Sequence, residues 1–473
     1  MKFTVISHAC LYIEHLNIRL LIDPWVIGSC YWRSWWNYPE PKEELIKSLN
    51  PTHIYITHLH WDHYHGPSLR LFENINPQII LPKHFNKRML GDCCKSFKFK
   101  NVIEINHGEK YNLGKSFYIT SYQFNPFCID SSLVVEADNT TLLNANDSKV
   151  FGLSLKQIIS NHKKFDFIFR SHSTASPLPH CIRGEKPEIS NRSPLEYAEE
   201  FASFAEATRC KYAIPFASSH IYLHDKSKRF NRFYTNPEIV KNIFEKKNNN
   251  KQNCILMPSG SYWESKKGFE LVKHDYSKID LDIKYLYKEK SNKLERQNNI
   301  EKKILLNKKA FHKYFKSFLK THICLFSTKF RFGYLIYQHR DKKLFLCLVD
   351  GKEKRTEIHL LNKESEIYDY NLSFTIRTPI YTFNDCNTKL MYNTFTPSKL
   401  LEIILIDKKA KKNLSNLLAL LDIYENDCLP LLKLVNIRNL NILIRRWREV
   451  FDIFIYIYIM KLRAGKIADL YKI

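Results

Sequence analysis

Four potential metal ligands lie within six residues, directly after a strand-like run of β-branched and aromatic residues. The segment 53–66 reads HIYITHLHWDHYHG, and its candidate ligands are His58, His60, Asp62 and His63. A strand carries the chain to the edge of a sheet, and the loop after it can turn its side chains toward one point. Imidazole and carboxylate groups together suit zinc, iron or manganese, and such close spacing favours two metal positions over one. A histidine-rich surface loop without a metal is the weaker alternative.

Short β-branched runs alternate with helical patterns from residue 1 to about residue 265. This alternation is typical of a layered α/β architecture. The clearest amphipathic helix of this part covers 194–208, with Ser193 as its expected N-cap. We therefore predict a first, metal-binding α/β domain over residues 1–270.

The chain becomes basic and helical after this region, with apolar residues at helical spacing between 284 and 320. We predict a basic helical connector over 271–325. The remainder, 326–473, mixes strand-like and helical patterns without a dense set of metal ligands. It is expected to form a smaller α+β accessory domain, and the sequence does not assign its role.

The formal net charge of +25 raises the question of a polyanionic partner. Nucleic acid, an anionic membrane surface or a nucleotide-sugar would each fit such a charge. The basic residues are spread along most of the chain, however, so a general compositional bias is the favoured explanation.

Several features bear on location. The N-terminus enters a strand pattern without the apolar core of a signal peptide, so a cytoplasmic location is expected. Twelve scattered cysteines without a C-x-x-C pair fit that compartment. No stretch reaches the roughly 20 apolar residues of a membrane helix, so no membrane span is expected.

The metal-ligand cluster and its surroundings resemble the metallo-β-lactamase superfamily, whose fold is an αββα sandwich. The likeness extends to 20–25, a strand ending in Asp23, to 142–147, a strand ending near Asp147, and to 215–224, a strand and loop with two histidines. Within the superfamily, the segments 23–25, 129–136 and 172–181 resemble the lactamase-like part of CMP-N-acetylneuraminate hydroxylase and its bacterial relatives. The resemblance implies that Asp23 braces the metal loop from behind. It also offers His8 as a support for the metal ligands, and a purely structural role for His8 is the alternative.

The resemblance also implies two unequal metal positions. One would be formed by Asp62, His63, the bridging Asp147 and His224, with His220 as the rival for the last place. The other would use His58, His60, Asp147 and a third His roughly 20 to 30 residues upstream of Asp147, where the sequence has none. The available substitutes are Gln123 and Asn125, whose amide oxygens are poorer zinc ligands than imidazole. The position with His58 and His60, called the first position below, is therefore expected to be weaker, or three-coordinate plus water.

Other residues are candidates for substrate binding. Trp32, Trp35 and Trp36 crowd the loop after Asp23 and could stack on a sugar or base, or anchor the loop to the domain. His172 and His180 flank a loop rich in Pro and Ser and are candidate substrate contacts.

The leading functional hypothesis is a metal-dependent hydrolase, with zinc as the first choice of metal and iron or manganese as alternatives. It would act on an anionic small molecule, phosphorylated or derived from sugar metabolism, through a metal-activated water, with Asp62 handling the proton. A non-haem diiron oxygenase of sugar or secondary metabolism is the first alternative. The C-x-H and C-x-x-H pairs of a Rieske centre are absent from the sequence.

Two further alternatives stay open on the sequence alone. A nucleic-acid-processing enzyme is disfavoured, because residues 148–211 are too few for the clamp domain that such relatives insert. A degenerate fold retained for binding would explain the missing third His. The sequence does not determine the oligomeric state.

Overall fold

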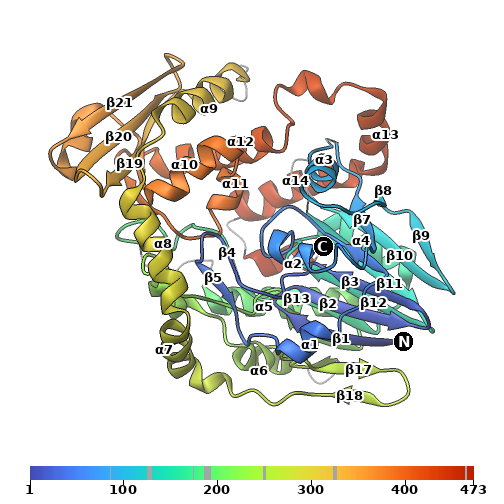
Figure 1. Cartoon of the computed structure of the whole chain (residues 1–473). Helices are drawn as coiled ribbons and strands as arrows, with labels where there is room; N and C mark the ends of the chain where they lie inside the picture. The colour runs from blue at the N-terminus through green and yellow to red at the C-terminus, as the bar shows by residue number, and fades with distance from the viewer. Residues whose placement is uncertain are drawn as a thin grey trace.

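Two facing β-sheets form the body of the N-terminal part of the chain (Figure 1). The structure is a computed structural model that describes residues 1–85, 87–124, 130–173, 175–185, 193–248, 252–322, 328–463 and 466–472. The first sheet has the order β18-β17-β1-β2-β3-β6-β7-β8 and the second the order β16-β14-β13-β12-β11-β10-β9. Apolar residues that alternate along the strands fill the space between the sheets, among them Phe3, Leu20 and Phe167.

The strands of the first sheet are β1 (Lys2–Ser7), β2 (Cys10–His15), β3 (Ile18–Ile22), β6 (His53–Tyr55), β7 (Gln78–Pro82), β8 (Val102–Ile105), β17 (Tyr262–Glu264) and β18 (Gly268–Glu270). The strands of the second sheet are β9 (Lys110–Gly114), β10 (Phe117–Gln123), β11 (Ser131–Ala137), β12 (Thr140–Asn146), β13 (Phe167–Ser171), β14 (Tyr212–Phe216) and β16 (Asn253–Cys254).

Helices cover the outer faces of both sheets. Over the first sheet lie α1 (Glu43–Lys47), α2 (Gly66–Arg70) and α3 (Arg88–Ser96), and over the second lie α4 (Gly152–His162), α5 (Pro194–Thr208) and α6 (Pro237–Asn248). Ser193 caps α5, since its side chain accepts a hydrogen bond from the Glu196 amide, as predicted. The predicted αββα sandwich is confirmed.

A small third sheet links two loops at one end of the sandwich. It contains β4 (Ser29–Cys30), β5 (Trp35–Asn37) and β15 (His220–Tyr222), in the order β15-β5-β4. In its register Asn37 faces His220 and Trp35 faces Tyr222. The aromatic loop after β3 is thereby held against the loop that carries His220.

Three helices lead from the sandwich to a second layer of structure. These are α7 (Ile279–Glu289), α8 (Ser291–Lys303) and α9 (Lys308–Lys320), which run up the left side of the view in Figure 1. The apolar face of α9 is buried through Phe311, Phe315 and Phe318 against the C-terminal strands, because its apolar residues recur at helical spacing.

The C-terminal part contains a five-stranded sheet with the order β21-β20-β19-β22-β23. Its elements are β19 (Arg331–Gln338), β20 (Lys343–Asp350), β21 (Arg355–Leu361), β22 (Phe374–Arg377), α10 (Ile380–Lys389), α11 (Tyr392–Phe395), β23 (Glu402–Leu405), α12 (Ala410–Glu425), α13 (Ile437–Arg445) and α14 (Trp447–Ile457). Shorter 3-10 or π segments are η2 (Lys228–Phe233), η3 (Tyr276–Lys278), η4 (Glu364–Tyr370), η5 (Leu431–Leu434), η6 (Tyr458–Leu462) and η7 (Ile467–Tyr471).

The segment 326–473 is not one separate unit, unlike the predicted accessory domain. Its sheet shares a hydrophobic core with Trp25, Tyr31 and Trp32 of the sandwich. The last helices return to the sandwich, where Asp452 accepts hydrogen bonds from the Leu153 and Ser154 amides at the start of α4, at 2.7 and 2.9 Å. Long-range packing, which local sequence patterns do not report, decides this arrangement.

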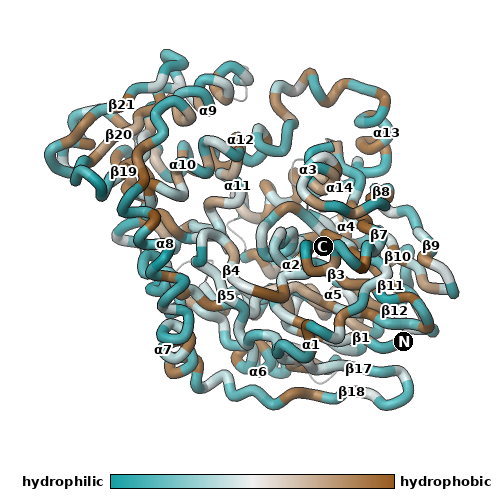
Figure 2. The backbone as a smooth tube through the Cα atoms, in the orientation of Figure 1, coloured by the Kyte–Doolittle hydropathy of each residue, from teal (hydrophilic) through white to brown (hydrophobic). Residues whose placement is uncertain are grey.

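The hydropathy of the chain follows the layers, with brown apolar strands inside and teal polar residues along most outer surfaces (Figure 2). Of the helices in the described ranges, none has both the length and the apolar character that crossing a bilayer requires.

The contact between α4 and α14 depends on a glycine. Gly152 has a φ of +57°, and an added Cβ would lie 2.3 Å from Asp452 Oδ1. We predict that Gly152→Ala lowers the free energy of unfolding by about 1–3 kcal/mol, because the side chain is strained and displaces Asp452. Urea unfolding followed by tryptophan fluorescence would measure this change.

Gly91→Ala in α3 is the matched control. A Cβ at Gly91 meets nothing within 4 Å, so the change should be neutral or stabilise by about 0.5–1 kcal/mol. Equal stability of Gly152→Ala and the unchanged protein would contradict the described docking of α14.

Candidate metal centre

One buried carboxylate, Asp23, holds the loop that follows β6. Its Oδ1 accepts a hydrogen bond from the Thr57 amide at 2.8 Å, and its Oδ2 accepts one from the Thr57 hydroxyl at 2.7 Å. Oδ2 also accepts from His63 Nδ1 at 2.8 Å and from Asn146 Nδ2 at 2.7 Å. Asp23 therefore lies behind the loop and joins it to the end of β12, instead of lying among the candidate donor atoms.

The first group of donor atoms consists of His58, His60 and Asp130, which offer ligand atoms within 4.8 Å of one another. His58 Nε2 lies 2.8 Å from His60 Nδ1 and 3.9 Å from Asp130 Oδ1. The loop after β6 supplies the histidines, and Asp130 comes directly before β11. Two imidazoles and one carboxylate converge on this position.

The second group consists of His8, Asp62 and His63, all of which are buried. Asp62 Oδ2 lies 3.1 Å from His8 Nε2 and 3.2 Å from His63 Nε2. His8 comes from the turn between β1 and β2. The structure thus brings His8 among the donor atoms, closer than the supporting place that the sequence suggested.

Asp147 lies between the two groups. Its Oδ2 is 3.8 Å from His58 Nε2 and 3.6 Å from His63 Nε2, and these three residues form a group of their own. Because the Asp147 carboxylate lies at similar distances from a histidine of each group, it could bridge two ions.

The hydrogen bonds of the two central histidines fit a metal. His63 Nδ1 contacts Asp23, and its Nε2 faces Asp62 and Asp147. Burial lowers the pKa of His63, but the charges of Asp62, Asp147 and Asp23 outweigh it and raise the pKa well above its usual value. His58 Nδ1 contacts the Thr57 hydroxyl at 2.9 Å, whose own hydrogen goes to Asp23, so His58 Nε2 is a lone pair. A bound metal ion would take the place of the proton at His63 Nε2, since metal ligands bind in their deprotonated form.

The carboxyl groups differ in their electrostatics. Burial alone would raise the pKa of Asp62, but the charges and hydrogen bonds of His63 and His8 hold it well below its usual range. Burial, followed by the charge of Asp147, raises the pKa of Asp130 to about 6. A carboxylate held as strongly as Asp62 is a poor proton acceptor, which argues against its predicted catalytic role.

Asp130 was missed by the sequence analysis and takes the place assigned to an amide. Gln123 pairs with Ser131 at the end of β10, and its Nε2 donates to the Lys83 carbonyl at 2.9 Å. Its buried Oε1 has no hydrogen-bond partner among the described residues, so its role as a ligand stays a prediction. Asn125 lies outside the described residues. Asp130 precedes Asp147 by 17 residues, just outside the window searched for a third His, and it is a carboxylate. The structure adds Asp130 to His58 and His60 at the position that the sequence predicts to be weaker or three-coordinate plus water.

His220, and not His224, lies next to the cluster. The His220 ring stacks on Trp35 with centroids 3.5 Å apart and lies 5.2 Å from the His8 ring. His224 Nδ1 instead accepts from the Lys226 amide at 3.1 Å, and in the described ranges no donor group includes it. The structure therefore places the rival His220, and not the preferred His224, beside the cluster, and neither belongs to a donor group of the described residues.

The phenol of Tyr31 donates a hydrogen bond to Asp62 Oδ1. Tyr31, Trp32 and Arg33 all have left-handed φ values, of 53°, 54° and 65°. This conformation costs roughly 1–2 kcal/mol per residue without glycine. Three consecutive left-handed residues have no signature in the sequence, which explains why Tyr31 was not foreseen.

The three predicted substrate-stacking tryptophans are buried and anchor the loop instead. The indole of Trp32 donates to Asp385 Oδ2 at 2.8 Å, that of Trp35 to the Pro397 carbonyl at 3.0 Å, and that of Trp36 to the Arg33 carbonyl at 3.0 Å. The bonds of Trp32 and Trp35 connect the sandwich to the C-terminal part. The tryptophans therefore anchor the loop, which is the second of the two predicted roles.

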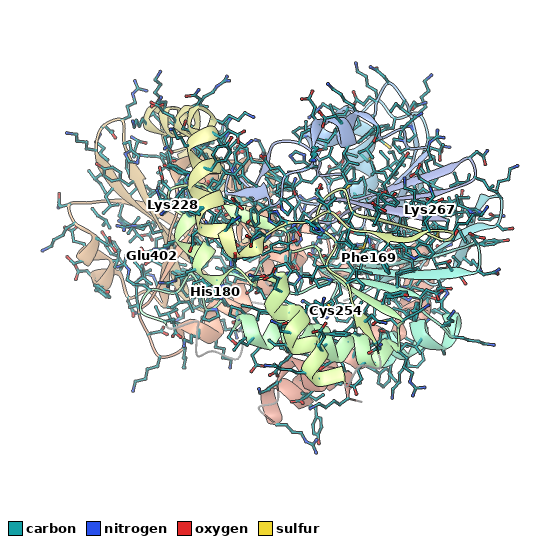
Figure 3. All side chains as sticks on the ribbon, turned by 90° about the horizontal axis from the view of Figure 1, so that it is seen from below. Phe169, His180, Lys228, Cys254, Lys267 and Glu402 are labelled. Carbon is teal, nitrogen blue, oxygen red and sulfur yellow. The ribbon has the colours of Figure 1, made fainter. Side chains whose placement is uncertain are left out.

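His172 and His180 are also buried, and neither belongs to a donor group of the described residues. His180 stacks on Phe233 with centroids 4.6 Å apart, and its Nδ1 lies 3.2 Å from Lys399 Nζ. In Figure 3 His180 lies on the side that carries Lys228 and Glu402, apart from Phe169 in the sandwich core. Burial lowers the pKa of His172 to about 3. Their predicted role in substrate contact is not supported, because neither side chain lines the cavity at the metal cluster.

A cavity of about 590 Å³ opens onto the first group of donor atoms. One wall contains His58, His60 and Asp130. The opposite wall comes from the C-terminal part, with residues of α11 and α12 and the segments after them, among them Asn393, Asp422 and Asn426. The C-terminal part therefore closes the cavity over the donor atoms.

Comparisons with known proteins agree with the fold. Residues 2–164 match the β-lactamase superfamily domain. The cytidine monophosphate-N-acetylneuraminic acid hydroxylase of Asterias rubens is 38% identical over 80 residues, which cover 17% of this chain and 12% of that protein. The enzyme of the same name from Pan troglodytes is 27% identical over 155 residues, covering 31% and 26%. The predicted resemblance is confirmed, and the aligned parts span about a quarter or less of these relatives.

Solved structures share the fold at low identity. The diiron β-hydroxylase CmlA of Streptomyces venezuelae has a TM-score of 0.39 at 16% identity and covers 55% of this chain and 53% of its own. The isothiocyanate hydrolase from Delia radicum gut bacteria has a TM-score of 0.41 at 14% identity, covering 56% and 99%. These likenesses concern the fold alone.

The donor groups predict different metal losses for different variants. Asp130→Ala should lose the ion of the first position and keep the other, because it removes one of three donors, whereas Asp147→Ala should weaken both. Elemental analysis after reconstitution with iron or zinc would measure this, with His224→Ala as the control that keeps the full metal content. Full metal content in Asp130→Ala would contradict the assignment.

The contact between Tyr31 and Asp62 predicts a weaker second position in Tyr31→Phe. Loss of a hydrogen bond to a ligand lowers metal affinity by about 10- to 100-fold, which competition with a chromophoric chelator would measure. Tyr38→Phe is the matched control, since that hydroxyl donates to Asp282 at 2.7 Å, away from the cluster. Equal metal affinities of Tyr31→Phe and Tyr38→Phe would contradict a role of Tyr31 in supporting Asp62.

Proposed function

We propose that this chain, whose residues 2–164 match the β-lactamase superfamily domain, is a non-haem iron oxygenase that hydroxylates a small polar molecule. The observation that carries the proposal is the donor set His58, His60 and Asp130 at the foot of the cavity. Two imidazoles and one carboxylate, with open positions, are the ligand set of non-haem iron oxygenases. Catalytic zinc also occurs with two histidines and one carboxylate, so the choice of iron rests on the hydroxylase relatives and on the loading experiment below.

The sequence relatives support oxidation. The two described above, at 38% and 27% identity, are hydroxylases by name. The chain spans about a quarter of them or less, so their substrate does not carry over with the likeness. The Rieske pairs are absent from these 473 residues, so the electrons would come from a separate donor.

The side chains have defined roles in such a reaction. Hydroxylation breaks a C–H bond and forms a C–O bond, and it consumes dioxygen, two electrons and two protons to give the alcohol and water. Iron would supply the activation of dioxygen. His58, His60 and Asp130 would hold one ion, and His63, Asp62 and His8 the other. Asp147 would bridge them, Asp23 would orient His63, and Tyr31 would orient Asp62.

The cavity supports a substrate different from the anion that the net charge suggested. Its charged lining residues besides the histidines are Asp130 and Asp422, and no Lys or Arg is among the described residues that line it. Asn426 Nδ2 donates to Asp422 Oδ1 at 3.0 Å, which holds two polar groups together on this wall. A substrate with hydroxyl or amine groups would suit Asn393, Asp422 and Asn426, and an anionic group would have only the metal end available.

Metal-dependent hydrolysis of an anionic small molecule is the second candidate. The group His8, Asp62 and His63 beside Asp147 could hold zinc or manganese, which would lower the pKa of a bound water. Asp62 would then orient the metal and not act as the base, because both of its oxygens have partners.

Loading with iron or zinc separates the two candidates. We predict that the iron-loaded protein consumes oxygen in the presence of ascorbate. In Asp130→Ala the rate should fall by at least about 100-fold, since even indirect changes at a metal cost about 10- to 100-fold in activity. His224→Ala should retain the rate. An oxygen electrode measures the first reaction, and p-nitrophenyl phosphate and acetate report hydrolysis.

The opposite pattern would overturn the proposal. Hydrolysis by the zinc-loaded protein, together with oxygen consumption by the iron form no faster than by Asp130→Ala, would favour the second candidate.

A further inference from the structure

The segment 432–458 presents an exposed apolar face that no part of the proposed function uses. Leu432, Val435 and Ile437 are exposed to 81%, 80% and 83%. Farther along, the exposed apolar residues are Leu440, Leu443, Ile444, Trp447, Val450, Phe451, Phe454, Ile457 and Tyr458. Figure 2 shows apolar residues of this segment at the outer edge of the molecule. A contiguous apolar surface of this kind marks an interaction site.

The opposite face of the same helices is docked on the sandwich. Asn439, Ile442, Glu449 and Asp452 recur at helical spacing and are buried. Arg438 pairs with Glu104 at 3.0 Å. Asp452 receives the two amides at the start of α4, as described above. Because the polar face is fixed in this way, the apolar face is held outward.

The outward face of α14 is rich in aromatic rings. Trp447, Phe451, Phe454 and Tyr458 follow one another at intervals of three or four residues, so they lie on one side of the helix. The rings of Trp447 and Phe451 have centroids 5.6 Å apart. Trp and Tyr with aliphatic neighbours are typical of surfaces placed at the boundary between lipid headgroups and acyl chains.

The exposed charges of this segment are all positive. Residues 431–463 contain only two acids, Glu449 and Asp452, each 1% exposed. Glu449 is paired with Arg446 at 2.6 Å. Arg448 and Arg463 lie over the rings of Trp447 and Tyr458, at 4.7 and 4.9 Å, and within the described part of the chain neither has an ion pair. Lys433 and Arg445 are paired with Asp427 and Glu109 outside the segment, so Arg448 and Arg463 are the cations that accompany the apolar face.

We propose that α13 and α14 bind the surface of an anionic phospholipid membrane, with their apolar face in the headgroup region. The helices have 9 and 11 residues, about half the length needed to cross a bilayer, so they would lie in the plane of the surface. Anionic lipid complements the cationic edge and the chain's net charge of +25. A two-fold pairing with a second copy would bring two cationic faces together, which is less favourable.

Vesicle co-sedimentation of the full chain tests the proposal. The protein should sediment with vesicles of phosphatidylcholine and phosphatidylserine, much less with phosphatidylcholine alone, and less at high salt. Trp447→Ser, Phe451→Ser and Phe454→Ser combined should abolish sedimentation without lowering the melting temperature, because these side chains are exposed. Each of Arg448→Gln and Arg463→Gln should weaken partitioning about fivefold, from roughly 1 kcal/mol per cation at an anionic surface.

The matched control replaces three exposed apolar residues elsewhere, Leu16→Ser, Leu281→Ser and Leu360→Ser, and should bind like the unchanged protein. Absence of sedimentation with anionic vesicles, or equal sedimentation with both kinds, would overturn the proposal. A dimer in light scattering that the triple aromatic variant converts to a monomer would overturn it as well, since a second copy would then cover the face. So would capture of an acidic protein partner in the absence of vesicle binding.

Discussion

The buried carboxylate of Asp23 is the interaction on which the candidate site depends. It follows β3 of one sheet, and its four hydrogen bonds reach the loop after β6 and the end of β12 in the other sheet. A buried charge is costly unless it is fully hydrogen-bonded, so these donors cannot move independently of one another. Through His63 and Thr57, Asp23 sets which nitrogen of each central histidine faces the site. The geometry of the donor groups is thus a consequence of how two sheets meet at one edge.

The aromatic loop couples this site to the C-terminal part. The left-handed turn at Tyr31 to Arg33 turns Tyr31 toward Asp62 and Trp32 toward Asp385. Its conformational cost is offset by burial of several large rings in the core shared by the two parts. A change at the C-terminal helices would therefore reach a candidate ligand as well as the wall of the cavity.

Sequence reasoning found the features that are local in the chain. The ligand cluster, the strand before it and a layered α/β architecture follow from spacing and alternation, and the family resemblance implies the αββα sandwich. Asp130 was missed because its place depends on the pairing of Gln123 with Ser131, which the sequence does not report. The choice between His220 and His224 failed for a similar reason, since it depends on where β15 stops pairing with β5. The sequence predicts that the tryptophans either anchor the loop or stack on a substrate. The hydrogen bonds of Trp32 and Trp35 to the C-terminal part distinguish the two.

By itself, the sequence determined a layered α/β architecture and the cluster His58 to His63, because alternation along strands and short ligand spacings are properties of neighbouring residues. The sandwich was implied by the family likeness that these motifs carry. Only the tertiary structure decided that Asp130 completes a donor group, that Tyr31 contacts Asp62 and that α11 and α12 close the cavity. These contacts join side chains whose separation in the chain says nothing of their distance in space. They depend on strand register and on burial of apolar surface between distant segments, and both are settled only when the whole chain packs.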